Sequence, residues 1–424
     1  MGKGSALASS IIKIGVLEEP KTLNTWRATD TWSRRVLSKI YQPLMLREPK
    51  DLKLVPWLAA EPPVYDPAAI CYTVKLRPAK WSDGTDLTAE DVAFTGNLIK
   101  EFKVPRDYSN WQFVKEIEVV DPRTLRFRLD KPHATFQTRT LTTPIVQKKQ
   151  WEGVAAQARK AEKPLAALNN HVMSQPVGCG PFMLKEWKKG SYLFLARNPH
   201  FFGKGLKIND AVLGPYIEGI IFKAFGTSDA AVLALKTGDI DTFWWGIQSG
   251  YIQDLQKEKN IRLFTNEKSG LYFLGFNLRK KPFDDVHFRH AVATLMDKDF
   301  ILQRVLQGYA VKMKSIVPPG NRLFCCPEVP EYGEGLAREA RIRKVYEILS
   351  KAGYQWKTPP VNAEGKLGKA EGFMLPDGSP MEDFTILTPP SDYDPHRAMV
   401  GMMAQEWLRA VGIPASSKPM AFGS

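Results

Sequence analysis

Four carboxylates are concentrated in residues 83–91, and they are the first candidates for chemistry: Asp83, Asp86, Glu90 and Asp91. Carboxylates at this density could serve acid–base catalysis or bind a hard cation. The surrounding residues indicate a structural role instead. The Asp-Gly pair at 83–84 suits a tight turn, and Thr88 stands where a helix N-cap is expected, with two of the carboxylates in the first turn. We therefore predict a strand, a turn and a capped helix across residues 81–95.

Two other patterns are typical of functional sites. His287 and His290 are three residues apart on a predicted helix, a spacing that can hold a metal, but no acidic or cysteine partner is indicated. Gly178-x-Gly180-Pro181 suggests a phosphate loop, yet the third glycine is absent and a strand is expected to follow. Motifs such as G-x-S-x-G and H-E-x-x-H are also missing. The sequence therefore predicts no metal site, no cofactor and no enzyme.

The composition argues against further classes of protein. The chain has 424 residues, of which 44% are hydrophobic, and this length is enough for two or three domains. Its net charge of +14 is scattered in short pairs, which argues against a nucleic-acid-binding protein. No apolar run is long enough to cross a bilayer. The four cysteines lack C-x-x-C spacing, and Cys71 lies in a strand-like run that predicts a buried thiol.

Hydrophobic periodicity predicts alternating strands and helices along the chain. The expected strands are 11–16, 43–47, 72–76, 114–120, 124–129, two joined at 188–190, 217–224, 239–245, 261–265, 271–277 and 383–388. The expected helices are 36–41, 92–99, 228–236, 288–295, 298–308, 338–352 and 396–407, with a loop or hairpin over 357–380.

Tryptophans suggest where a ligand would bind. Trp244 and Trp245 end a predicted strand, and adjacent strand residues point to opposite faces, so at least one of them should be exposed or line a cavity. Trp26 lies in the loop after the first strand and is a third candidate.

Five stretches, taken together and in this order, resemble one family: the cluster C, family 5 solute-binding proteins of ABC importers, of the oligopeptide and dipeptide type. The stretches are Val55–Glu61, Lys80–Thr95, Val177–Phe182 with Arg197–Pro199, Gly238–Asp241, and Phe276–Asn277 with Pro282–Ala291. The resemblance covers residues 11 to 415. Cys179 departs from the small polar residue usual in the family, and we expect this change to be neutral.

The resemblance implies an α/β fold with two lobes, of the periplasmic-binding-protein type II (cluster C) architecture, with an extra mixed α+β subdomain. Lobe one would comprise residues 11–41 and 171–265, the subdomain 42–170, and lobe two 266–424. Family members continue past the position of Ser424 to complete both lobes. We therefore expect lobe two to be incomplete here, with the returning segment a separate chain or absent from this one.

The resemblance also implies a function, that of the substrate-binding component of an ABC importer. Such a protein lies in the periplasm or is tethered outside the membrane, acts as a monomer, closes its two lobes around a peptide-like ligand and delivers it to a membrane permease. A nickel complex, an oligosaccharide or another small molecule is the alternative ligand, and a hydrolase is less favoured. The expected ligand contacts are Trp244, Trp245 and Trp26, with Tyr393, Asp394 and Arg397 before the last helix, although a structural role is favoured for these last three.

Overall fold

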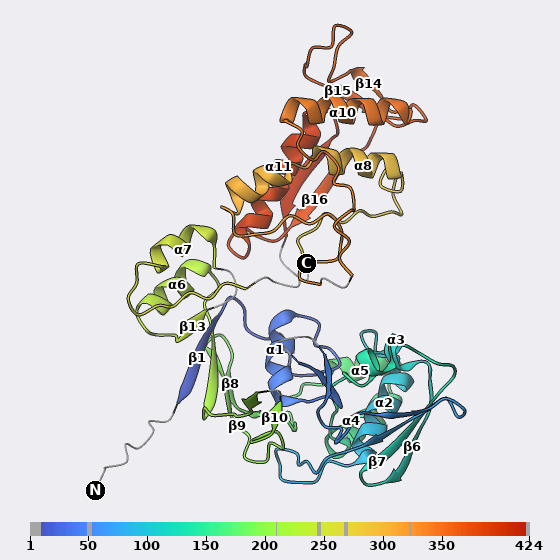
Figure 1. Ribbon diagram of the computed structural model, residues 1–424, viewed down its shortest axis with the longest axis vertical. Coiled ribbons are helices and arrows are strands. Elements are labelled where there is room, and N and C mark those ends of the chain that lie inside the picture. Colours follow the sequence, from blue (N-terminus) through green and yellow to red (C-terminus); the bar gives the residue numbers. More distant parts are fainter. Residues whose placement is uncertain are drawn as a thin grey trace. The chain divides into compact units, whose positions relative to one another are not determined.

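The computed structural model describes residues 10–48, 53–208, 210–243, 247–266, 270–321 and 324–420. The chain divides into two compact units, and Figure 1 labels their elements. Unit 1 comprises residues 1–225 and 237–243, and unit 2 comprises 226–236 and 244–424. The predicted lobe one extended to residue 265, whereas residues 226–236 and those after 243 group with unit 2. Within unit 2, α6 (Ser228–Lys236) and α7 (Ser249–Leu255) are joined by an ion pair between Lys236 and Asp254.

A five-stranded sheet forms one half of unit 1, in the order β13-β1-β12-β9-β8. Its strands are β1 (Ile11–Val16), β8 (Phe182–Lys188), β9 (Tyr192–Arg197), β12 (Gly219–Ala224) and β13 (Thr242–Phe243). β1 pairs in parallel with both β12 and β13, while β9 is antiparallel to β12 and to β8. The predicted hairpin at 188–190 is therefore confirmed, and the predicted strand at 239–245 is described only at residues 242–243.

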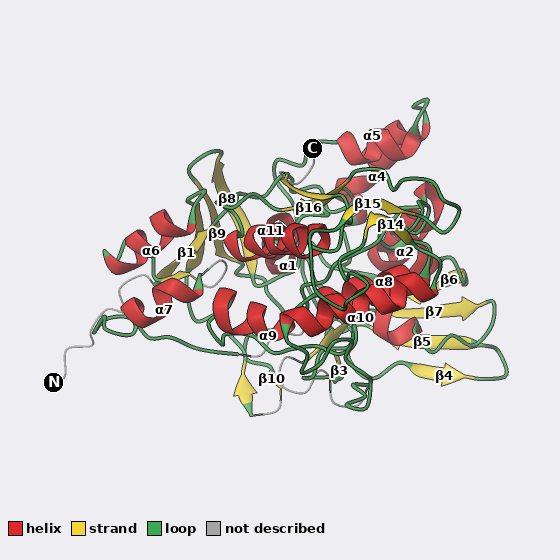
Figure 2. Cartoon of the chain, turned by 90° about the horizontal axis from the view of Figure 1, so that it is seen from above, coloured by secondary structure: helices red, strands yellow, loops and turns green. Residues whose placement is uncertain are grey.

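A smaller mixed region of unit 1 falls within residues 42–170, and its four-stranded sheet has the order β4-β5-β7-β6 (Figure 2). The elements of this region are β2 (Met45–Arg47), β3 (Leu54–Pro56), β4 (Val64–Asp66), β5 (Cys71–Lys75), α2 (Ala89–Phe102), α3 (Tyr108–Trp111), β6 (Val114–Asp121), β7 (Thr124–Leu129), η1 (Phe136–Thr140), α4 (Lys148–Arg159) and α5 (Pro164–Asn170). Unit 1 also contains α1 (Thr31–Ile40) and the short pair β10 (Lys207–Ile208) and β11 (Ala211–Val212).

The four carboxylates of residues 83–91 serve the turn and the helix cap, as predicted. Asp91 is buried, and its side chain accepts hydrogen bonds from the Thr88 amide (2.9 Å), the Lys148 amide (2.8 Å) and the Trp81 indole (3.2 Å). The other three carboxylates bond within the turn or pair with nearby side chains: Asp83 with Thr85 and Gln147, Asp86 with Lys80, and Glu90 with Lys148. These bonds tie α2 to the start of α4, and this carboxylate group is structural.

The Gly178-x-Gly180 pattern arises from close backbone packing. A Cβ at Gly178 would lie 2.0 Å from the Ile40 carbonyl oxygen, and one at Gly180 would lie 2.2 Å from that of Lys39. The Gly180 amide donates to the Ile40 carbonyl over 2.7 Å. Only glycine allows the segment before β8 to lie directly on the C-terminal end of α1.

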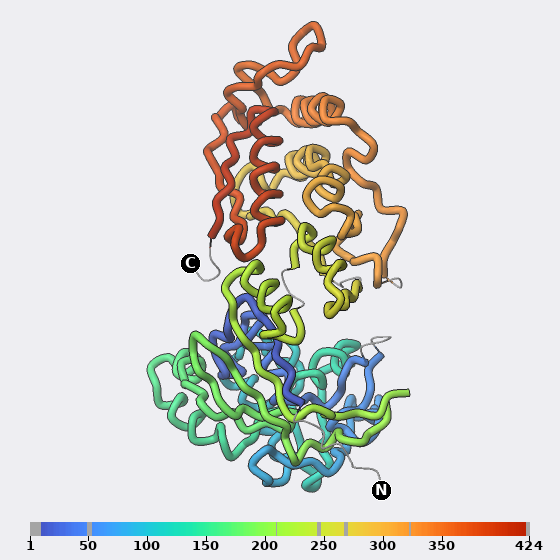
Figure 3. The backbone as a smooth tube through the Cα atoms, turned by 90° about the vertical axis from the view of Figure 1, so that its left-hand side faces the viewer, coloured from blue at the N-terminus to red at the C-terminus, as the bar shows by residue number. Residues whose placement is uncertain are grey.

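Unit 2 packs its helices on short strand pairs, and Figure 3 shows its last helix running beside its last strands in red. Its remaining elements are α8 (Val286–Leu295), α9 (Lys298–Phe300), η2 (Ile301–Val305), α10 (Arg338–Lys351), β14 (Gln355–Thr358), β15 (Glu371–Met374), β16 (Phe384–Thr388), α11 (Pro395–Arg409) and β17 (Ala415–Pro419). Phe288, Leu349 and Leu408 belong to one buried core that joins α8, α10 and α11. The predicted hairpin over 357–380 is confirmed by the antiparallel pair β14–β15.

Two predicted strands do not form in the described residues of unit 2. Residues 261–265 and 271–277 make no strand ladder, and their apolar side chains Phe264 and Phe273 are largely exposed. Both segments are rich in the apolar and aromatic residues that are typical of strands. A strand also needs a partner for its backbone groups, which sequence periodicity does not supply.

Substitution of Gly180 by alanine should destabilise unit 1 by about 2 kcal/mol or more, because the new Cβ would displace the end of α1. Gly153, exposed in α4 with nothing within 4 Å of an added Cβ, is the matched control. Its change to alanine should stabilise by about 0.5–1 kcal/mol. Urea unfolding followed by circular dichroism measures both. Equal effects of the two substitutions would contradict the packing described.

The thiols should separate into two reactivity classes. Cys71 and Cys179 are buried in unit 1, and burial raises the pKa of Cys179 to about 12, so its thiol stays protonated at pH 8. Cys326 is exposed and Cys325 partly exposed. We expect a thiol reagent at pH 8 to label the latter two first, and the buried pair only after unfolding. Because the folded pKa is raised, the folded state should lose stability as pH rises from the thiol's usual range towards 12.

Candidate ligand-binding site

The carboxyl edge of the parallel strands in unit 1 is the best candidate for a binding site. β1 lies between β12 and β13, and the three strands end at Val16, Ala224 and Phe243. In open α/β sheets, ligands bind beyond the carboxyl ends of parallel strands, where the connections lead to opposite sides. β8 runs in the same direction as β12, since both are antiparallel to β9, so the turn after β8 lies at this edge too.

A cavity of about 360 Å³ is formed at this edge by the loop after β1 and the turn after β8. Its lining residues are Glu18, Glu19, Pro20, Lys21, Trp187 and Lys189. One oxygen of Glu19, Oε2, accepts hydrogen bonds from the Trp187 indole and from the Gly190 amide, each over 3.2 Å. The Lys189 ammonium lies 5.3 Å from the centre of the Trp187 ring. The cavity thus combines an aromatic wall with groups of both charges.

Near this edge, polar contacts fix the residues that lead into β13. The Asp239 carboxylate pairs with Lys223 on β12, and the hydrogen bond from this ammonium lowers the pKa of Asp239. Asp241 accepts from the backbone amide of Lys13 on β1 over 2.7 Å. Gly238 has φ +77°, which allows the turn between α6 and β13. The Gly238–Asp241 stretch therefore orients β13, and the chain continues from Phe243 into unit 2.

The three tryptophans predicted as ligand contacts differ in how far the structure describes them. Trp26 is 5% exposed and packs edge-to-face on Trp151, with ring centres 5.6 Å apart. Its side chain is therefore part of the core of unit 1. Trp244 and Trp245 lie outside the described residues.

Tyr393, Asp394 and Arg397 lie at the N-terminus of α11 in unit 2. Asp394 caps this helix, accepting from the backbone amide of Arg397 (2.9 Å) and from its side-chain Nε (2.7 Å). Tyr272 joins them, because its hydroxyl donates to Asp394 over 3.2 Å and its ring lies 5.2 Å from the Arg397 guanidinium carbon. His396 and Ser249 of α7 approach to 3.4 Å at the same helix end. These residues form a polar cluster at the N-terminus of α11, and the role that the structure shows for it is to cap this helix.

Sequence reasoning missed the cavity at the carboxyl edge. Glu19 and Trp187 are 168 positions apart, and no local pattern links them. The only available signal was the position of the loop directly after the first strand. Tyr272 was also missed, since it belonged to a segment interpreted as a strand.

Two negative observations concern the described residues. Within the ranges that the structure describes, no three histidine, cysteine, aspartate or glutamate side chains are grouped so as to hold a metal ion. Among the described helices, none has the length and apolar character needed to cross a membrane.

Similarity to other proteins extends over nearly the whole chain. The chain is 27% identical over 415 residues to the oligopeptide-binding protein AppA of Bacillus subtilis, which covers 96% of this chain and 68% of AppA. It is 27% identical over 353 residues to the glutathione-binding protein GsiB of Escherichia coli K12, covering 82% of this chain and 62% of GsiB. The chain thus spans about two thirds of the length of these curated relatives.

Solved structures share the fold. The structure of Bacillus subtilis AppA in complex with a nonapeptide has a TM-score of 0.77 at 24% identity, over 97% of this chain and 75% of that one. NikZ from Campylobacter jejuni in complex with Ni(L-His) has a TM-score of 0.76 at 22% identity, over 99% of this chain and 75% of that one. The predicted two-lobed α/β fold class is confirmed by these similarities.

The family profile described as "Bacterial extracellular solute-binding proteins, family 5 Middle" matches residues 53–423, which is most of the chain. The five sequence stretches, the fold and this match agree. The chain belongs to family 5 of the bacterial extracellular solute-binding proteins.

Proposed function

We propose that this protein is the extracytoplasmic substrate-binding component of an ABC importer and that it captures a peptide-like ligand. The observation that carries the proposal is the similarity to oligopeptide-binding AppA over 96% of the chain. AppA and GsiB are both binding proteins by name, so we propose that the ligand is bound and released without chemical change. The partner is the membrane permease of the importer, and the protein acts as a monomer.

The carboxyl-edge cavity has the chemistry that a peptide needs. A peptide is zwitterionic and has both apolar and polar surface. Trp187 offers an aromatic wall, while Glu18 and the two lysines, Lys21 and Lys189, offer charges that suit its ammonium and carboxylate groups. We propose that this cavity holds part of the ligand.

Further contacts are proposed from both units. Trp244 and Trp245 follow β13 in the chain and remain proposed ligand contacts. Tyr393, Asp394 and Arg397 remain proposed contacts from unit 2, with the Arg397 guanidinium as the group for a ligand carboxylate. Trp26 is buried against Trp151, so we propose that it affects ligand binding only through the packing of unit 1.

A small nickel complex is the second candidate ligand. The similarity to NikZ in complex with Ni(L-His) favours it, because the two folds match about as well as those of this chain and AppA. In that case the complex would be the transported solute and not a resident cofactor.

Calorimetric titration distinguishes these ligands. We expect peptides of two to nine residues to bind with one-to-one stoichiometry and micromolar or tighter affinity, and Ni(L-His) to bind more weakly. Amide exchange should become slower in residues 17–24 and 188–191 when a peptide is added. Binding of Ni(L-His) without binding of any peptide would replace the first candidate by the second. Hydrolysis of the peptides would contradict both.

Glu19 provides a test of the cavity itself. Its change to alanine removes the acceptor for the Trp187 indole and the Gly190 amide, so the turn should loosen and peptide affinity should fall about tenfold. Exchange of the Gly190 amide should become faster.

The matched control is Glu186→Ala. Glu186 lies on the same hairpin, is exposed and bonds to the Tyr192 hydroxyl outside the cavity, so peptide affinity should stay unchanged. If the two substitutions have the same effect on affinity, this cavity is not where the peptide binds.

A further inference from the structure

Two adjacent thiols, Cys325 and Cys326, lie in the loop of unit 2 that connects η2 to α10. Among the described residues of this loop, 306–321 and 324–337, none belongs to a helix or a strand. Cys326 is exposed, Cys325 is partly exposed, and neither is bonded to another cysteine. The pair is therefore accessible to reagents in solution, and the capture of a solute makes no use of it.

No other cysteine of the chain is available as a disulfide partner for this pair. The remaining two, Cys71 and Cys179, are buried in unit 1 and are 8% and 0% exposed. A disulfide needs its two sulfur atoms about 2 Å apart, so a bond from a buried thiol to the surface loop would require unit 1 to open. Within one folded chain, each exposed thiol can therefore bond only to its neighbour.

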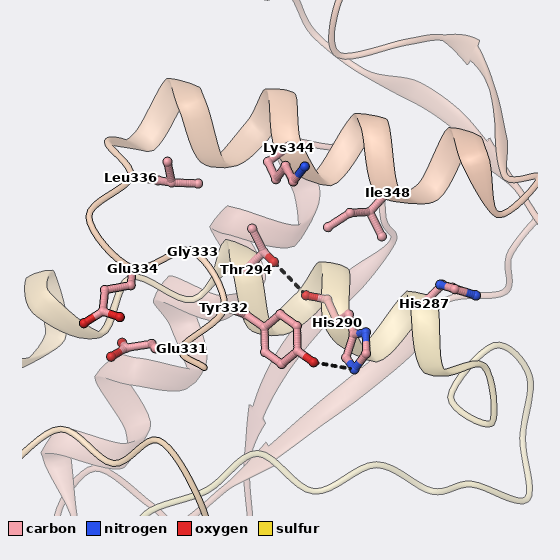
Figure 4. A pocket seen from close by; sticks show the side chains of 10 residues that line it. All are labelled: His287, His290, Thr294, Glu331, Tyr332, Gly333, Glu334, Leu336, Lys344 and Ile348. Atoms are coloured by element: carbon pink, nitrogen blue, oxygen red, sulfur yellow. Dashed lines mark hydrogen bonds between the residues drawn. The ribbon is translucent and has the colours of Figure 1, made fainter. Parts of the chain in front are cut away.

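The loop is anchored to helices on both sides of the pair. Before the pair, Lys312 forms an ion pair with Asp299 of α9 over 2.8 Å. After the pair, the Tyr332 ring stacks on His290 of α8 with centres 4.4 Å apart, and its hydroxyl lies 2.9 Å from His290 Nε2 (Figure 4). A local change at the two cysteines can therefore occur while these contacts stay in place.

The backbone around the pair belongs to no strand ladder that ring closure would break. The Cys325 amide donates to the Asn321 carbonyl over 2.9 Å, and Pro327, which follows the pair, has no amide proton to donate. A disulfide between neighbours strains the backbone, because consecutive Cα atoms are about 3.8 Å apart and most disulfides span roughly 4.4–6.8 Å. Strained and exposed disulfides are easily reduced, so a bond between these two residues should be reversible.

We propose that Cys325 and Cys326 form a reversible disulfide with each other when they meet a small disulfide such as glutathione disulfide. The thiolate of one cysteine attacks a sulfur of the oxidant, which forms a mixed disulfide and releases one glutathione thiolate. The neighbouring thiolate then attacks the protein sulfur of this mixed disulfide and expels the second glutathione. The two cysteines lose two electrons and two protons, and the oxidant gains them as its own S–S bond breaks.

The adjacent thiol gives the protein a way to be oxidised without cross-linking. A single exposed thiol that forms a mixed disulfide keeps its adduct or reacts with a second molecule. A neighbouring thiol instead resolves the adduct within the same chain, where its effective concentration is high. The proposal rests on unit 2 alone and on the burial of the other thiols, so it does not depend on the identity of the transported solute.

Mass spectrometry of the folded protein after incubation with excess glutathione disulfide at pH 8 tests the proposal. Remaining thiols are alkylated, and the mass of the tryptic peptide 323–338, which contains both cysteines of the pair and no other, is measured. We expect this peptide to be lighter than its reduced form by two hydrogens and to carry no alkyl group. Excess reduced glutathione should restore both thiols.

Cys325→Ser and Cys326→Ser are the matched variants, because each leaves one thiol of the pair in the same loop. Each variant should carry one glutathione on this peptide or form a disulfide-linked dimer, at a level at least about tenfold above that of the unchanged protein. Circular dichroism checks that the variants fold. The proposal is overturned if both thiols of the unchanged protein stay free, if either retains glutathione, or if the unchanged protein forms dimers as readily as the variants.

Discussion

The contact between the Gly178–Gly180 segment and the end of α1 holds unit 1 together. The Gly180 amide donates to the last residue of α1, and Asn198 donates from its side chain to the Gly180 carbonyl over 2.8 Å, which brings in the end of β9. The Ser82 amide donates to the Gly178 carbonyl over 2.8 Å, which brings in the turn before α2. One short glycine segment thus fixes the five-stranded sheet, its first helix and the smaller mixed region relative to one another.

This arrangement leaves one edge of the five-stranded sheet for connecting loops. With α1 and the smaller region held at β8, the carboxyl ends of β1, β12 and β13 remain as the edge from which loops project. Glu19 joins two of those loops through a single carboxylate oxygen. The carboxylates of residues 83–91, by contrast, already bond to other groups of the chain. Asp91 alone accepts three hydrogen bonds. The density of acidic residues in the sequence therefore marked a turn and a helix cap, whereas the cavity at the carboxyl edge arises from the connections at the strand ends.

The charged groups of unit 2 also bond to other groups within the fold. Asp394 and Arg397 bond to each other and cap α11, so their visible role is local. Arg341 donates to the backbone carbonyls of Leu336 and Thr294 and so joins a loop to α8. Glu331 has partners as well, because Lys298 and Lys312 lie 3.5 and 4.0 Å from its two carboxylate oxygens. The role of each group is read from its hydrogen-bond and ion-pair partners in the fold, and residue type alone does not give it.

Local pattern in the sequence determined the elements whose ends have chemical causes: the cap at Thr88, the helix from Ser228 to Lys236 and the hairpin at 188–190. The five sequence stretches, taken in their order, indicated the family. Tertiary structure alone decided the rest. Residues 271–277 have the apolar and aromatic composition of a strand but no paired ladder, because pairing depends on another segment. Glu19 meets Trp187 because folding brings distant residues to one place, and periodicity contains no information about such contacts.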